Sequence, residues 1–164
     1  HGQVLSFTKR DYRAALSLLD QAIAAGPSCY MAWALSSTTA GWMGDVERAV
    51  EHATRALQLS PLDPFAFFAE HMLSQGYYVS GDHANAITWG RRAETHNPML
   101  TSNLRTLAGA LVAAGEIDEA RKIARRILDT DPAFSLKAFA ARSAMAPKIL
   151  EFHIPRLRTA GLPD

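Results

Sequence analysis

The side chains that could hold a metal ion or attack a substrate are scattered along the chain. None of the six histidines has a helical spacing to a cysteine or a carboxylate that would form a metal site. Cys29 is the only cysteine, and a cysteine without a nearby histidine is more often a small packing residue than a nucleophile. These residues predict no metal, no cofactor and no catalytic group. The histidines are His1, His52, His71, His83, His96 and His153.

Motifs for phosphate and nucleic-acid chemistry are missing as well. The sequence has no glycine-rich phosphate loop and no GxSxG turn, so it predicts a chain that is not an enzyme. Seventeen basic and sixteen acidic side chains leave a formal net charge of +1, too small to attract nucleic acid or an anionic membrane from a distance. A basic cluster could grip phosphate, but its helical pattern favours a solvated outer face. The cluster is Arg121, Lys122, Arg125 and Arg126.

The sequence also indicates a cellular setting. One cysteine cannot form an internal disulfide, and neither a secretory signal nor an apolar run of roughly 18 residues, as a membrane span requires, is present. We therefore predict a reducing, cytoplasmic location. Because the chain starts at His1 and enters helix-like sequence at once, we expect it to be part of a longer protein.

The elements that position all these residues come from a repeat. Residues 44–61 read GDVERAVEHATRALQLSP, and similar segments occupy residues 10–27, 81–98 and 115–132. Their final prolines, at positions 27, 61, 98 and 132, are separated by 34, 37 and 34 residues. A period of this length is typical of a solenoid built from helix pairs.

Each segment has the pattern of one helix between two turns. A small residue lies twelve positions before each final proline, and in three of the four segments another lies five before it. Because seven residues make two turns, these two columns lie on one face, where a neighbouring helix can approach closely. Gly44 breaks the preceding helix, and Asp45 can cap the next one. Each period therefore predicts helix, glycine turn, helix and proline turn.

This pattern resembles the tetratricopeptide repeat, most closely at Trp33, Ala49, Ala56 and Pro61. The resemblance implies an all-α fold, a right-handed αα superhelix of antiparallel helix pairs. The predicted array covers residues 1–132, with repeats at about 1–27, 28–61, 62–98 and 99–132. Residues 133–164 continue the helical pattern, and we expect them to cover the last apolar face of the solenoid.

The same resemblance implies a concave groove lined by the first helix of each pair. The groove would be apolar and aromatic, which suits an amphipathic helix or an extended apolar segment of a partner. Met31, Leu35 and Met72 could equally pack between helix pairs. Related adaptors that clamp a terminal carboxylate use several basic and amide side chains, of which only Arg105 is available here, so this activity is not expected. The candidate groove residues are Met31, Leu35, Thr38, Trp42, Phe68, His71, Met72, Gln75, Tyr78 and Arg105.

Three stretches go beyond the generic repeat. HGQVLSFTKRDYRAAL from His1, QLSPLDPFAFF from Gln58 and LRTAGLP from Leu157 resemble the C-terminal repeat region of certain bacterial proteins. Those proteins carry a class III adenylate or guanylate cyclase domain, or a winged-helix DNA-binding domain, ahead of the repeats. The resemblance implies an accessory role in signal transduction, with the chemistry in the preceding domain.

Two functions of different classes follow. The first is a non-catalytic scaffold that binds a protein or peptide segment, including the parent chain's own N-terminal domain, in its groove. The alternative is a structural homo-oligomerisation element whose groove is filled by a neighbouring copy, giving a homodimer. We predict that Phe68→Ala combined with Tyr78→Ala weakens partner capture and leaves the helical melt almost unchanged.

Overall fold

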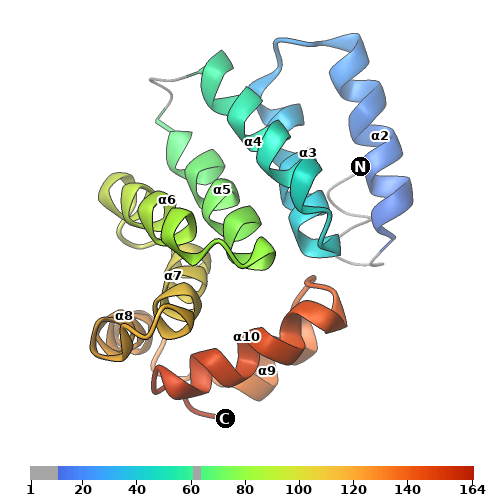
Figure 1. The fold of residues 1–164 in the computed structure, drawn as a ribbon. Coiled ribbons are helices and arrows are strands. Elements are labelled where there is room, and N and C mark those ends of the chain that lie inside the picture. The colour runs from blue at the N-terminus through green and yellow to red at the C-terminus, as the bar shows by residue number, and fades with distance from the viewer. Residues whose placement is uncertain (1–10, 61–63) are drawn as a thin grey trace.

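The described part of the molecule is built from helices alone. The structure, a computed structural model, describes residues 11–60 and 64–164, and it contains no strand within them (Figure 1). The all-α class is therefore confirmed. The helices are α2 (Tyr12–Ala25), α3 (Tyr30–Met43), α4 (Val46–Leu59), α5 (Ala66–Ser80), α6 (His83–His96), α7 (Thr101–Ala113), α8 (Ile117–Thr130), α9 (Leu136–Arg142) and α10 (Pro147–Thr159).

Glycine turns separate the two helices of each pair, as predicted. Gly44, Gly81 and Gly115 have φ angles of 86°, 87° and 85°. These angles lie in the left-handed region, which is costly for a residue with a Cβ atom. The chain therefore reverses direction at these glycines, between α3 and α4, α5 and α6, and α7 and α8.

Carboxylates cap two of the helices that follow these turns. Asp45 accepts a hydrogen bond from the backbone N–H of Arg48 at 3.3 Å, and Asp82 accepts one from that of Asn85 at 3.1 Å. Each bond satisfies one of the free N–H groups of the first helical turn. Glu116 stands at the same place before α8 but makes no side-chain cap bond. Its contribution is limited to placing negative charge near the helix start.

The small-residue columns lie where the helices pack. Ala49, Ala86 and Ala120 are at most 1% exposed, so the second helices approach their neighbours through methyl groups. Ala22, from the first segment, differs because it is exposed on α2. The predicted helical tail that precedes α2, residues 1–8, lies outside the described residues.

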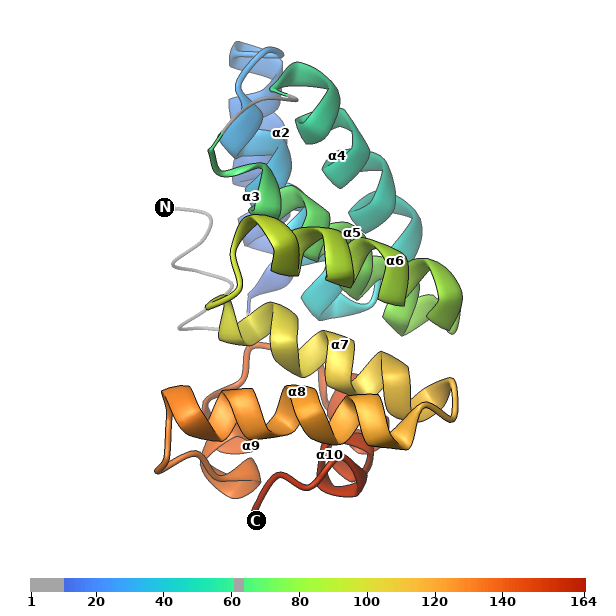
Figure 2. The same cartoon turned by 90° about the vertical axis from the view of Figure 1, so that its left-hand side faces the viewer.

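First and second helices are buried in different ways. The first helices α3, α5 and α7 contact both their own partners and one another, so they are buried on most sides and contain buried polar residues. The buried hydroxyls of Ser37 and Ser74 are satisfied because they donate hydrogen bonds to the backbone carbonyls of Ala49 and Ala86, at 2.7 and 2.8 Å. The second helices α4, α6 and α8 each keep one solvent-exposed face. This makes the first helices the inner layer of the solenoid (Figure 2).

Residues 133–164 form α9 and α10 and do more than cover the end of the array. α10 packs against α7, and Leu157 joins the apolar cluster of α7 and α8. At the other end of α10, the N–H of Ala146 donates to the carbonyl of Trp42 at 2.8 Å, next to the end of α3. The segment therefore runs back across the carboxyl-terminal ends of the inner helices (Figure 1).

Candidate functional site

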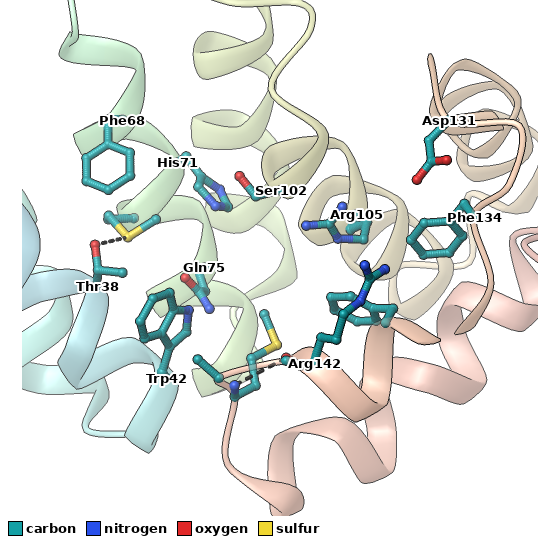
Figure 3. A pocket seen from close by; sticks show the side chains of 15 residues that line it. Thr38, Trp42, Phe68, His71, Gln75, Ser102, Arg105, Asp131, Phe134 and Arg142 are labelled. Carbon is teal, nitrogen blue, oxygen red and sulfur yellow. Dashed lines mark hydrogen bonds between the residues drawn. The ribbon is translucent and has the colours of Figure 1, made fainter. Parts of the chain in front are cut away.

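A pocket of about 590 Å³ lies on the inner layer (Figure 3). Its walls are the second half of α3, the first two thirds of α5 and the first half of α7 on one side and the chain from Asp131 to Met145 on the other. Its size is within the range of sites that enclose a small ligand or a few side chains. The lining residues are Thr38, Trp42, Phe68, His71, Met72, Gln75, Ser102, Arg105, Asp131, Phe134, Phe139, Arg142, Ser143, Ala144 and Met145.

The structure gathers most of the candidate groove residues around this pocket. The candidates in its lining are Thr38, Trp42, Phe68, His71, Met72, Gln75 and Arg105. Met31 and Leu35, from the first half of α3, lie outside the lining: Met31 is 45% exposed and Leu35 is half-buried. Tyr78 also lies outside it.

Tyr78 is covered by the C-terminal helix. Its side chain is 1% exposed, and its hydroxyl lies 3.0 Å from Nδ1 of His153 in α10. Burial raises the pKa of Tyr78 to about 12, with the guanidinium of Arg156 opposing the change. Gly109 permits this contact, because a Cβ atom there would lie 2.7 Å from the Tyr78 hydroxyl. The structure thus gives Phe68 and Tyr78 different surroundings, and the double variant is therefore no longer expected to leave the helical melt unchanged.

One wall of the pocket comes from residues that the sequence analysis did not select. Phe134, Phe139 and Arg142 belong to the C-terminal segment. The sequence predicts only that this segment covers the last repeat, because nothing in the repeat period indicates that it returns to the inner layer. The helical pattern around Phe139 was the available signal, but it does not specify which surface the helix meets.

Arg105 is the principal charge inside the pocket. Its half-buried guanidinium lies 4.8 Å from the centre of the Phe139 ring and, among the described residues, makes no hydrogen bond or ion pair. Burial lowers the pKa of Arg105 to about 10, and the carboxylate of Asp131 opposes this change. Arg105 therefore remains protonated at neutral pH, with its charge facing a partly desolvated space.

Two buried polar side chains also border the pocket without full hydrogen bonding. His71 is 4% exposed and Gln75 is 2% exposed, and neither Nδ1 of His71 nor Nε2 of Gln75 has a partner in the described structure. Burial, assisted by Arg105, lowers the pKa of His71 to about 3, while the nearby side chain of Asn103 favours the protonated ring. His71 is therefore neutral at physiological pH. Such unpaired atoms are costly in a core, unless a ligand satisfies them.

Reactive clusters are missing from the described part of the chain. There, no three histidine, cysteine or acidic side chains come together in a way that could hold a metal ion. Cys29 is exposed at the start of α3. None of the described helices is both long and apolar enough to span a bilayer.

The basic cluster of α8 lies on the outer layer. Lys122 pairs with Glu119 at 2.6 Å, Arg121 pairs with Asp118 at 3.3 Å, and Arg126 pairs with Glu94 of α6. These carboxylates neutralise much of the local charge, so the cluster does not form a concentrated basic patch.

Comparison with known proteins identifies the class of fold. The tetratricopeptide repeat family matches residues 7–64, and no curated protein matches the chain. A thermophilic tetratricopeptide-repeat protein of Thermus thermophilus, TTC0263, is 19% identical with a TM-score of 0.70, over 96% of this chain and 94% of that one. MamA is 20% identical with a TM-score of 0.66, over 93% and 88% of the two chains.

A third solved structure has a title that mentions a ligand. YrrB, described as a tetratricopeptide-repeat protein with an unusual peptide-binding site, is 20% identical with a TM-score of 0.61, over 97% of this chain and 80% of that one. At these identities the similarity concerns the fold. The predicted tetratricopeptide-like solenoid is therefore confirmed, and both kinds of comparison support a tetratricopeptide-repeat protein. Folds of this class present extended concave surfaces to other proteins and are generally not catalytic.

Proposed function

We propose that this chain is a non-catalytic protein-interaction module that captures a segment of a partner protein in the pocket of its inner layer. The observation that carries the proposal is the chemistry of the pocket: aromatic and methionine side chains surround polar atoms that have no partner among the described residues. Phe68 and Met72 offer apolar contact, and His71 and Gln75 offer hydrogen bonds. A short peptide can use both, since its side chains are apolar and its backbone is polar.

The size of the pocket favours a few anchoring side chains over a whole buried helix. About 590 Å³ is comparable with small-ligand sites, and an α-helix with its side chains is roughly 10–12 Å across. The rest of the partner segment would lie over the amino-terminal ends of α3, α5 and α7. Three exposed apolar side chains occur at the start of these helices, and such exposure is typical of an interaction surface. They are Met31, Phe65 and Met99.

The proposal also extends to the longer protein that contains this chain. The resemblance of residues 1–16, 58–68 and 157–163 to cyclase-linked and winged-helix-linked repeat regions supports a regulatory or scaffolding role in a bacterial, cytoplasmic signalling protein. In that setting the partner segment would belong to a second protein or to the parent chain's own N-terminal domain. Any nucleotide cyclisation or DNA binding would reside in that other domain.

The competing function is homo-oligomerisation, with a neighbouring copy on the inner layer. The exposed Met31, Phe65 and Met99 are the observation that favours it. Static light scattering over a range of concentrations distinguishes the two functions: the interaction module is expected to be monomeric, and a dimer that persists on dilution would support oligomerisation.

Peptide selection tests the proposed function directly. A phage-displayed library of short linear peptides is selected on the whole chain, and the enriched peptides are synthesised and titrated by fluorescence anisotropy. We expect Phe68→Ala to weaken binding strongly. Phe67→Ala is the matched control, because Phe67 is the adjacent ring on α5 and does not line the pocket. Failure to enrich any peptide, or equal binding by Phe68→Ala and wild type, would reject the proposal.

A further inference from the structure

We infer that the partner segment places an acidic side chain in the pocket, with Arg105 as its counter-charge. This inference rests on the proposed function and specifies the chemistry of the captured residue. It starts from the contrast between Arg105 and four arginines of the outer layer. Arg48, Arg91, Arg92 and Arg126 each pair with a carboxylate of the chain, whereas Arg105 pairs with none in the described structure.

The nearest available acid does not neutralise Arg105. Asp131 lines the same pocket and acts on Arg105 through space, but no ion pair joins them and Asp131 is exposed at the pocket's edge. A guanidinium in a partly desolvated site loses hydration and is stabilised most strongly by a planar carboxylate, which it binds through two parallel N–H···O bonds. An anion that enters the pocket could therefore form the ion pair that Arg105 lacks in the described structure.

Other groups around Arg105 also have hydrogen-bond donors to offer. The Ser102 hydroxyl donates no hydrogen bond in the described structure, and Nε2 of Gln75, itself 2% exposed, has no partner. Figure 3 shows Ser102, His71 and Gln75 around the same space as Arg105. An incoming group with two acceptor oxygens would satisfy several of these atoms together, which a purely apolar side chain would not do.

The charges of the lining residues favour a bound group that carries a single negative charge. The lining contains two permanently charged cations, Arg105 and Arg142, against one carboxylate, Asp131, and His71 is neutral. One added carboxylate balances the site, whereas a dianionic phosphate would leave an excess of negative charge in a poorly solvated space.

The shape of the pocket favours a side chain over the end of a peptide. The rings of Phe68, Phe134 and Phe139 can pack against the methylene stem of glutamate or aspartate while the partner's main chain stays hydrated at the opening. A terminal carboxylate would bring its own backbone N–H group inside, next to Arg105 and Nε2 of Gln75, which are themselves donors without a partner in the described structure. The inference therefore commits to an internal acidic residue next to an apolar one.

The test uses the peptides obtained by selection on the wild-type chain. We expect aspartate or glutamate at one fixed position of their consensus. Replacing that acid by its amide in the peptide should weaken binding about tenfold or more, because the charge pair is lost. The substitution leaves the protein untouched, so a folding defect cannot mimic the result. Arg105→Gln should cause a similar loss, and combining both changes should cost little more than either alone.

Arg125→Gln is the matched control, since Arg125 is an exposed arginine of α8 outside the pocket. Arg105→Lys should bind the peptides more tightly than Arg105→Gln and less tightly than wild type, because it keeps the positive charge but loses the planar guanidinium. A consensus without an acid, or peptides that bind Arg105→Gln as well as wild type while Phe68→Ala abolishes binding, would overturn this inference and leave the proposed function intact. Binding that depends on a free peptide C-terminus would also overturn it. Absence of any enriched peptide would reject the proposed function and the inference together.

Discussion

The two ends of the inner helices have opposite surroundings. At their carboxyl-terminal ends, α10 lies on Tyr78 and Gly109, which are both buried. At their amino-terminal ends, Met31, Phe65 and Met99 remain exposed. The pocket runs from the last turn of α3, at Trp42, to the start of α7, at Ser102. A solenoid surface is thus either core or binding site according to what covers it, since repeat packing alone leaves the inner layer open.

The largest effect should come from removing a ring at the covered end. Tyr78→Ala deletes a fully buried aromatic side chain and leaves Nδ1 of His153 without its partner, so we expect a loss of about 3–5 kcal/mol in the free energy of unfolding. Phe68→Ala, at the half-buried pocket wall, should cost clearly less. Urea unfolding followed by circular dichroism measures both. Equal losses would show that the two ends do not differ as the structure indicates.

Acid should destabilise the protein through its two buried neutral histidines. Burial lowers the pKa of both His153 and His71 to about 3, with Arg105 adding to the effect on each ring and Arg156 on His153. Below pH 6.5 the unfolded chain binds protons that the folded chain does not, so stability falls as the pH decreases from 6.5 toward 3.

Variants of each ring test this contribution. Over pH 6.5 to 5, above the range in which most carboxylates titrate, His153→Gln and His71→Gln should each flatten this decline by a similar amount, because both rings are neutral in the folded protein throughout that range. Thermal melts across this pH range measure the slopes. If the melting temperature of both variants fell with decreasing pH as steeply as that of the wild type, the prediction would be wrong.

Close packing under α10 should make Gly109 intolerant of a methyl group. Gly109→Ala would bring Cβ within 2.7 Å of the Tyr78 hydroxyl and 3.1 Å of Nδ1 of His153, so we expect a loss of about 1–3 kcal/mol. Gly41→Ala is the control, because in α3 the nearest atoms lie at 3.7 Å and the change should be neutral or stabilising. Similar melting temperatures for the two variants would argue against tight docking of α10.

The smallest effect on stability is expected at the open end. Met99→Ser alters a side chain that is 62% exposed, so the free energy of unfolding should change by no more than about 0.5 kcal/mol. Binding of the selected peptides should weaken modestly if the partner segment runs over this end. Unchanged peptide affinity in Met99→Ser and in Met31→Ser would confine the contact to the pocket.

Local features of this fold could be derived from the sequence because short-range chemistry sets them. Gly44 and Gly81 adopt the left-handed conformation that other residues avoid, and Asp45 and Asp82 cap the helices that begin beside them. Ala49 and Ala86 are buried because their spacing places them on one helical face. These outcomes depend on residues a few positions apart, and the repeat displays them several times.

The placement of residues 131–164 was decided by tertiary structure. Tyr78 and His153 are separated by 75 positions, and Trp42 and Ala146 by more than one hundred, so no repeat period relates them. Their contacts convert part of the predicted groove into core and supply Phe134 and Phe139 to the pocket. The sequence determined which helices form and which faces are apolar. Which apolar face meets which other depends on the summed packing of distant segments, and this also left Arg105 beside an aromatic ring with no ion pair among the described residues.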